Sequence, residues 1–171
     1  MGLFDFLTGS KKPAKGSTAI PVGDLRAAFL ALNRDSAPWQ VRDGAAEGCD
    51  LVAEWRLVDA RWYEIFAKAG LTKVEKVLMK FDATKVEVRA VDQSWTVEWR
   101  AGVPSLSLQA AAFRGQKKEM SFGAAWAFKE EDLTYGKVYQ YRFNSGELKT
   151  PLQDCATSHG WGWRGVAFGK L

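Results

Sequence analysis

A helical repeat of apolar residues, at i, i+3, i+4 and i+7, occurs twice in the first 70 residues. Its members are Leu25, Ala28, Phe29 and Leu32 in the first case and Trp62, Ile65, Phe66 and Ala69 in the second. Asp24 and Asp59 stand where helix N-caps are expected, and Gly70 follows the second repeat as a stop. We therefore expect helices over residues 24–33 and 59–70.

Most of the remaining chain alternates apolar and polar residues, which is the period of a half-buried strand. The alternating segments are 51–58, 76–81, 86–90, 95–99, 120–128 and 139–143, with a further segment around 106–113. Strands in succession, without regular alternation with helices, are typical of antiparallel sheets and argue against a doubly wound parallel fold. The sequence predicts an α+β domain: a strongly bent antiparallel sheet or partial barrel packed by two or three helices.

Two connections in this domain can also be predicted. Residues 92–94, Asp-Gln-Ser, are typical of a turn. A hairpin at that turn would form cross-strand ion pairs on the wet face between Glu87 and Arg89 on one strand and Glu98 and Arg100 on the next. The stretch 33–48 is loop-like, and we expect Trp39 and Val41 to anchor part of it.

The C-terminal region has the pattern of a helix start. Thr150 is a suitable cap, Pro151 suits the first helical position and Gln153 the third. Gly160 is placed to end that helix. A last strand is expected from Trp161 to about residue 168.

The first 20 residues differ in character from the rest. The apolar tip (Leu3, Phe4, Phe6 and Leu7) is followed by a small, basic stretch (Lys11, Lys12 and Lys15), broken by glycine and proline. Such a composition is typical of a flexible linker. We expect residues 1–20 to form a flexible tip and linker, and residues 21–171 a single domain. Three fates remain open for the tip: docking to an anionic membrane surface or a partner, packing back onto the domain, or remaining a disordered tail.

Charge and targeting signals restrict the possible partners and location. Three lysines against Asp5 give the first 20 residues a charge of +2, half of the net +4, and no basic cluster is visible along the sequence of the domain itself. This distribution argues against nucleic-acid binding. No stretch of about 20 apolar residues and no secretory signal pattern occurs. We expect a cytoplasmic protein, with peripheral attachment at the inner face of a membrane if the tip binds lipid.

The chain offers few groups for catalysis. Cys155 and the single histidine, His159, lie four apart on one helical face, where they could share a metal or act as nucleophile and base. The same face carries Leu152 and Ala156, which indicates that it points into the core. A zinc site would need two further ligands, and Cys49 is the only other cysteine. We expect no metal, no cofactor and no enzymatic activity.

Aromatic residues are abundant by comparison, since the chain has eight tryptophans. Trp55, Trp62, Trp95, Trp99 and Trp126 fall on the apolar stripes of predicted elements and are expected in the core. The candidate binding residues are therefore Trp39, His159, Trp161, Trp163 and Arg164. Together with the tip, they suggest a non-catalytic binding or adaptor module. The alternative is a barrel-like domain that holds a small apolar or sugar ligand.

Overall fold

The computed structural model of the chain describes residues 9–59, 62, 66–67, 73–100, 103–108, 145–166 and 171, with the backbone alone for 103–108 and 145–146. The elements in chain order are α2 (Val22–Leu30), β1 (Trp39–Asp43), the short 3₁₀ helix η1 (Ala45–Glu47), β2 (Leu51–Trp55), β3 (Lys73–Asp82), β4 (Glu87–Arg100), β5 (Val103–Leu108), α4 (Ser145–Ser158) and β6 (Gly162–Gly165). The apolar tip, most of the predicted helix 59–70 and the predicted strands 120–128 and 139–143 lie outside the described residues.

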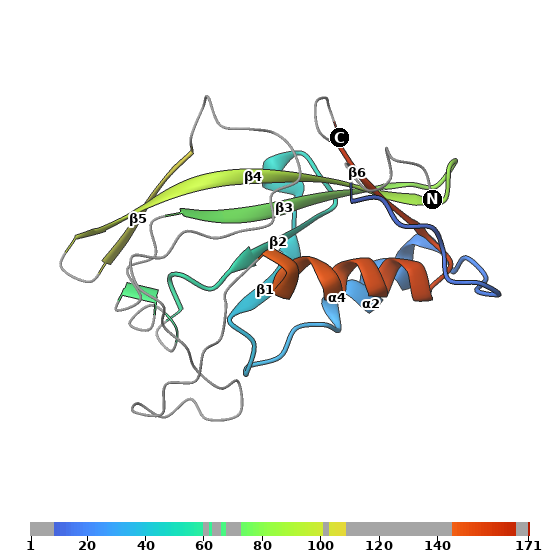
Figure 1. Cartoon of the computed structure of the whole chain (residues 1–171), viewed down its shortest axis with the longest axis horizontal. Coiled ribbons are helices and arrows are strands. Elements are labelled where there is room, and N and C mark those ends of the chain that lie inside the picture. The colour runs from blue at the N-terminus through green and yellow to red at the C-terminus, as the bar shows by residue number, and fades with distance from the viewer. Residues whose placement is uncertain are drawn as a thin grey trace.

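The described strands form one mostly antiparallel sheet in the order β1-β2-β3-β4-β5. The short strand β6 pairs in parallel with the first residues of β4, from Glu87 to Ala90. Because β3 also pairs with those residues, β6 must lie on the same edge of β4 as β5, which pairs with the other end of that strand. The long β4 therefore connects two parts of the sheet (Figure 1).

The α+β class is confirmed, but the expected strong bend or partial barrel is wrong. The sheet is neither closed nor strongly curled, and β1 and β5 stand at opposite ends of the strand order. The helices α2 and α4 both lie on one side of it (Figure 1). A sheet covered by helices on one face can bury its apolar residues without closing on itself.

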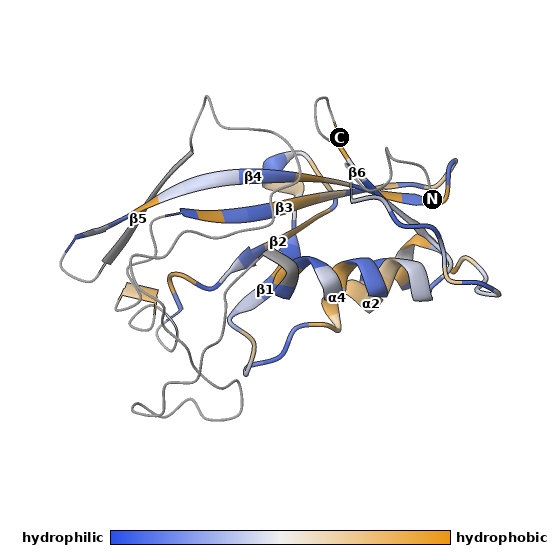
Figure 2. Cartoon of the chain, in the orientation of Figure 1, coloured by the Kyte–Doolittle hydropathy of each residue, from blue (hydrophilic) through white to orange (hydrophobic). Residues whose placement is uncertain are grey.

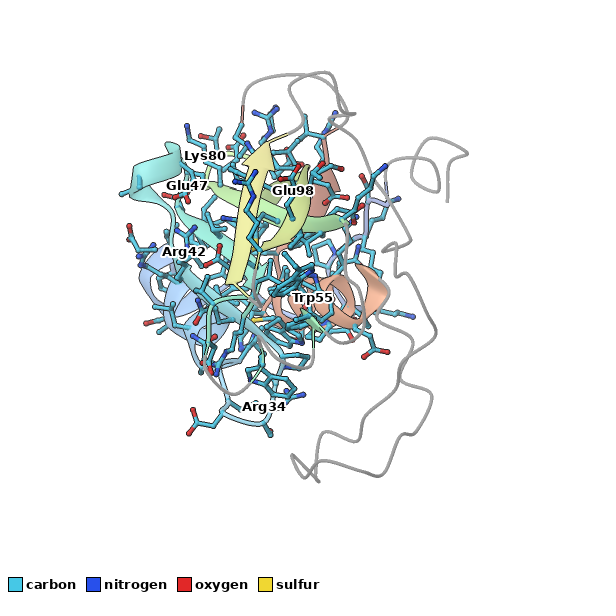
Figure 3. The ribbon with its side chains drawn as sticks, turned by 90° about the vertical axis from the view of Figure 1, so that its left-hand side faces the viewer. Arg34, Arg42, Glu47, Trp55, Lys80 and Glu98 are labelled. Carbon is cyan, nitrogen blue, oxygen red and sulfur yellow. The ribbon has the colours of Figure 1, made fainter. Side chains whose placement is uncertain are left out.

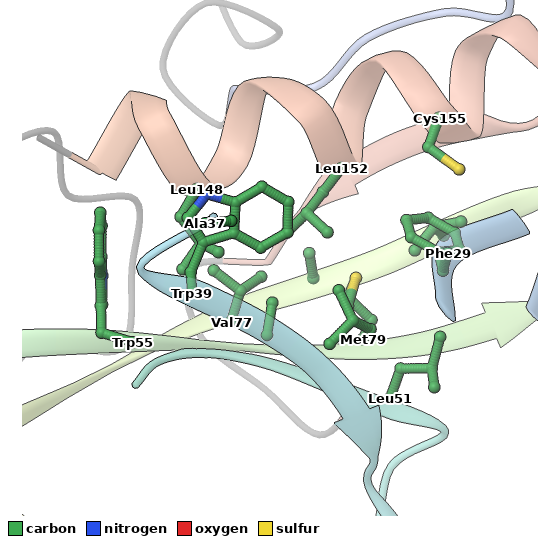
Figure 4. Packing of buried hydrophobic residues seen from close by; sticks show 14 of the residues in the cluster. Phe29, Ala37, Trp39, Leu51, Trp55, Val77, Met79, Leu148, Leu152 and Cys155 are labelled. Atoms are coloured by element: carbon green, nitrogen blue, oxygen red, sulfur yellow. The ribbon is translucent and has the colours of Figure 1, made fainter. Parts of the chain in front are cut away.

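The main core lies between the sheet and these two helices. Leu25 and Phe29 of α2 are fully buried there, which confirms the predicted helical face, although α2 begins at Val22 and Asp24 lies in its first turn. Leu148, Leu152 and Cys155 of α4 project toward the same core (Figure 4). Hydrophobic and hydrophilic residues are mixed along β3 and β4 (Figure 2), and Val77, Met79, Val88 and Ala90 of these strands belong to the main core.

The predicted turn at 92–94 is wrong, because β4 runs through it without interruption. Glu87 and Glu98 consequently belong to one strand, and the expected hairpin ion pairs do not form. The physical reason is the pairing of this stretch with β3 and the burial of Asp92 and Ser94, which are 1% and 4% exposed. Cross-strand pairing over ten positions outweighs the local turn preference of three polar residues.

Two other boundaries also differ from the sequence-based expectation. Part of the predicted loop 33–48 is strand β1, in which Trp39 pairs with Trp55 of β2. The helix α4 begins at Ser145, so Pro151 lies inside it and not at its first position. The additional residues place Leu148 in the core, and this burial stabilises helix upstream of the capping pattern.

Candidate functional site

The basic stretch that follows the tip, expected from its composition to be a flexible linker, makes main-chain contacts with the domain. Lys11 and Trp163 of β6 exchange both main-chain hydrogen bonds, at 2.7 and 2.8 Å. Further along, the amide of Ala14 donates to the carbonyl of Thr157 at 2.9 Å. The main chain of residues 9–20 thus follows β6 and the C-terminal end of α4 (Figure 1). Its composition suits a linker, but β6 and the last turn of α4 offer backbone partners that no local pattern reveals.

Side chains add to this attachment at both ends of the segment. Gln153 of α4 donates from Nε2 to the carbonyl oxygen of Gly9 at 3.3 Å. Lys11 Nζ lies 3.7 Å from a carboxylate oxygen of Asp154. At the other end, the indole Nε1 of Trp161 donates to the carbonyl of Ile20 at 2.8 Å. The point at which the tip joins the domain is therefore fixed beside α4 and β6.

Gly160 allows the segment to pass this closely. It ends α4 as predicted, with a left-handed φ of +77° that favours glycine. A β-carbon at this position would stand 2.3 Å from the backbone nitrogen of Ala19 and 2.3 Å from the carbonyl carbon of Thr18. Gly160 is thus required by its own conformation and by the neighbouring chain.

The three tryptophans proposed as binding residues all lie in the core. Trp39, Trp161 and Trp163 are 1%, 3% and 2% exposed and belong to the main apolar cluster. Figure 4 shows Trp39 beside Leu148 of α4. Burial of this kind accounts for the aromatic residues through packing alone and favours neither candidate function.

The imidazole of His159 is engaged by its own helix. Its Nδ1 lies 2.7 Å from the carbonyl oxygen of Cys155, which can only accept, so the ring donates from Nδ1. Burial raises the pKa of the Cys155 thiol to about 11, which opposes its ionisation. In the described part of the chain, no group of three or more histidine, cysteine, aspartate or glutamate side chains could hold a metal ion.

Arg164 is the exposed member of the predicted set, and the sheet brings two other cations beside it. Lys80 of β3 is the cross-strand partner of Arg89 in β4, and Arg89 is the partner of Arg164 in β6. We call these three residues the basic row. They lie on the face away from the helices, because their strand neighbours Val88 and Trp163 are buried on the helix side.

Within the described residues, no carboxylate lies in ion-pairing distance of Arg89 or Arg164. Lys80 Nζ donates to a main-chain oxygen of Leu171, the last residue of the sequence, at 3.4 Å. The nearest acidic residues on that face occupy the next pairing position, Asp82 opposite Glu87. Asp82 accepts hydrogen bonds from two turn amides at 3.1 Å, so part of its charge is used in the turn.

A second charged group on β1–β3 is arranged differently, because its charges neutralise one another. Arg42 binds Glu47 and Glu54 at 2.5 and 2.7 Å, and Lys76 binds Glu54 at 3.0 Å. Arg42 and Glu47, both labelled in Figure 3, are joined by a hydrogen bond from Arg42 to Glu47. Burial alone would raise the pKa of Glu54, but the hydrogen bonds from Arg42 and Lys76 hold it below its ordinary value. Hydrogen bonds from Arg42 likewise lower the pKa of Glu47. We interpret this group as structural.

A buried polar group lies on the helix side of the sheet. Lys149 of α4 forms an ion pair with Asp92 of β4, and both side chains are almost fully buried. Ser94 is the cross-strand partner of the buried Glu75, two residues further along the same face. Among the residues that the structure describes, the hydroxyl of Ser94 has no hydrogen-bond partner, which is uncommon for a buried hydroxyl.

Sequence reasoning missed Lys80, Arg89 and the Asp92–Lys149 pair. The alternation of 76–81 and 86–90 does place Lys80 and Arg89 on wet faces. What it cannot provide is the register that sets them opposite each other and opposite Arg164, since β6 comes from about 75 residues further along the chain.

Comparison with known protein families, with curated proteins and with solved structures finds no match. Among the described helices, none is long and apolar enough to cross a membrane.

Proposed function

We propose that this chain is a non-catalytic binding or adaptor module that attaches through its N-terminal tip to a membrane surface or a partner protein. The observation that carries the proposal is the pairing of Lys11 with Trp163, together with the hydrogen bond from Gln153 to Gly9. These contacts fix the base of the tip on the domain. An anchored tip loses less conformational freedom on docking than one on a loose tether, so its attachment is stronger for the same contacts.

The proposal keeps the location expected from the sequence: the cytoplasm, with a peripheral position at the inner face of a membrane when the tip binds lipid. Four large apolar residues in the first seven would supply the contact, and Lys12 and Lys15, which follow them in the sequence, are exposed in the docked segment. Apolar side chains followed by basic ones suit an interface with anionic lipid or an acidic groove.

Deletion of residues 2–8 tests this proposal without disturbing the docked segment. We expect the deletion to abolish co-fractionation with membranes or capture of the partner, while the thermal unfolding midpoint stays within about 2 °C of the wild type. The matched control is V58S, which removes an apolar side chain that is 79% exposed elsewhere on the domain. If deletion leaves partners and location unchanged, the proposal loses its main support.

The second candidate is a small-ligand-binding domain, and the buried hydroxyl of Ser94 favours it. An open sheet has no barrel lumen, so an apolar or sugar ligand would lie between sheet and helices, near Asp92 and Lys149. Native mass spectrometry of the purified protein tests this candidate. A bound mass that disappears in S94A would support it, whereas a ligand-free wild type would argue strongly against it.

A further inference from the structure

We propose that the basic row of Lys80, Arg89 and Arg164 docks onto an anionic lipid bilayer at the edge of the domain where the tip is attached. This inference rests on the proposed function, because it names a lipid surface as the partner of the same N-terminal region. It adds a second contact, made by the folded domain, to the one made by the tip.

The geometry of the sheet brings the three cations together. Lys80, Arg89 and Arg164 are direct cross-strand partners on three neighbouring strands. Since neighbouring strands are about 4.8 Å apart, the three side chains start within roughly 10 Å of one another. Lys80 and Arg164 are exposed and Arg89 is half-buried. A compact group of cations on one face is thus open to a partner.

Electrostatics indicates that the row needs an external anion. Like charges directly opposite each other across strands destabilise a sheet. Arg42 on β1 is neutralised by two carboxylates, whereas no carboxylate of the described residues pairs with Arg89 or Arg164. An anionic surface would relieve the repulsion and accept hydrogen bonds from the exposed side chains of Lys80 and Arg164.

The docked N-terminal segment connects the row with the tip. Lys11 pairs with Trp163, so the segment lies along β6, the strand that carries Arg164. Residues 9–11, which follow the tip directly in sequence, therefore lie beside the strand that carries Arg164. Leu3, Phe4, Phe6 and Leu7 of the tip would supply an apolar contact with acyl chains. Nucleic acid offers no comparable site for such a tip, and this difference favours lipid as the partner.

Neither contact is sufficient alone for stable attachment. A short apolar segment gives only marginal membrane affinity, and stable peripheral binding generally combines two signals, such as an apolar anchor and a basic patch. Each lysine or arginine near an anionic bilayer strengthens partitioning about fivefold. The row and the tip together satisfy this requirement from one edge of the domain.

Co-sedimentation with vesicles tests the inference. The full chain is mixed with vesicles of phosphatidylcholine alone or of phosphatidylcholine with phosphatidylserine. We expect binding to the anionic vesicles that weakens with added salt, and little binding to the neutral ones. Removing two charges in K80Q/R164Q should lower the partition coefficient roughly 20- to 30-fold. The conservative K80R/R164K should bind as the wild type does.

The matched control is K73Q/R100Q, which removes one exposed lysine and one exposed arginine at the far ends of β3 and β4. We expect this control to stay within about twofold of the wild type, because the lost charges lie away from the docking edge. Equal losses in the two double variants, or no loss in either, would overturn the inference. The inference would also be overturned if the wild type did not bind anionic vesicles, or if it bound duplex DNA through Lys80 and Arg164 instead.

The two proposals can fail separately. If deletion of residues 2–8 abolishes attachment while K80Q/R164Q binds anionic vesicles normally, the basic row has no role and the proposed function stands. If K80Q/R164Q loses binding to vesicles and the deletion keeps it, the row is a lipid contact and the tip is not the attachment element. Circular dichroism and thermal unfolding of each variant establish that its fold is intact.

Discussion

The backbone of Thr18 crosses Gly160 so closely that a β-carbon on Gly160 would stand 2.3 Å from the Thr18 carbonyl carbon. Gly160 has a left-handed φ of +77°, and so does Gly48, at +74°, although nothing lies within 4 Å of a β-carbon at Gly48. The two glycines therefore share a conformation and differ in their surroundings. Alanine substitutions at these two glycines therefore separate the effect of backbone strain on stability from the effect of the docked N-terminal segment.

We predict that G160A is more destabilising than G48A. G48A should lose about 1 kcal/mol, the usual cost of alanine in the left-handed region. G160A should lose about 3 kcal/mol, because the methyl group also displaces residues 18 and 19. Hydrogen exchange should report faster exchange at the amides of Lys11 and Trp163 in G160A alone. Equal destabilisation by both substitutions would show that the segment is held independently of Gly160.

The buried pair of Asp92 and Lys149 should make a large contribution to stability. K149M removes the cation that lies against a carboxylate only 1% exposed, and we expect a loss of about 3–5 kcal/mol in urea unfolding. The control is K11M, which removes the lysine of the exposed pair with Asp154 and should cost less than about 0.5 kcal/mol. A loss below about 1 kcal/mol in K149M would contradict this account of the pair.

Stability should fall in acid partly through Glu47 and Glu54. The pKa of each is lower in the folded protein than its ordinary value of 4.5, so their contribution is present above that value. It is lost as the pH falls through the lower folded values. In E54Q, we expect unfolding free energy to drop by about 2 kcal/mol at pH 7 and to decline less steeply between pH 5 and 3.

The control for this pH dependence is E98Q. Glu98 pairs with Arg100 at 3.6 Å, but both side chains are exposed, at 60% and 83%. An exposed pair contributes little to stability, so the pH profile of E98Q should match that of the wild type. Identical acid profiles for E54Q and the wild type would show that the network around Arg42 does not contribute to the acid transition.

The two cysteines should react slowly in the folded protein. With the pKa of Cys155 raised to about 11 by burial, about one thiol in a thousand is ionised at pH 8. Burial also raises the pKa of Cys49. We expect labelling with a thiol-specific disulfide reagent to be at least 100-fold slower in buffer than in 8 M urea. C49S isolates Cys155, and fast labelling of this variant without urea would show that the thiol is accessible.

Local patterns predicted the interior of elements better than their ends or partners. The repeat that contains Leu25 and Phe29 identified the buried face of α2, and alternation identified β2, β3 and most of β4. The turn expected at residues 92–94 failed because Asp92 is paired with a lysine from α4, more than 50 residues away. No signal within a short window reports such a partner.

Prediction of the candidate sites shows the same division. Arg164 was selected from sequence together with Trp161 and Trp163, but the structure separates them, since only Arg164 is exposed. Alternation along β6 puts Trp163 on the helix side and Arg164 on the other. Whether any of these residues binds a ligand or partner stays a prediction.

The sequence by itself determined the α+β class, the buried face of α2, the stop at Gly160 and the unlike faces of the main strands. These depend on periodicity and on the conformational preferences of single residues, which act over a few positions. Only the tertiary structure decided that the sheet stays open, that residues 9–20 lie along α4 and β6, and that Lys80, Arg89 and Arg164 stand side by side. Each of these features depends on pairing between residues that are distant in the chain, and such pairing is chosen by the free energy of the whole fold rather than by any local stretch.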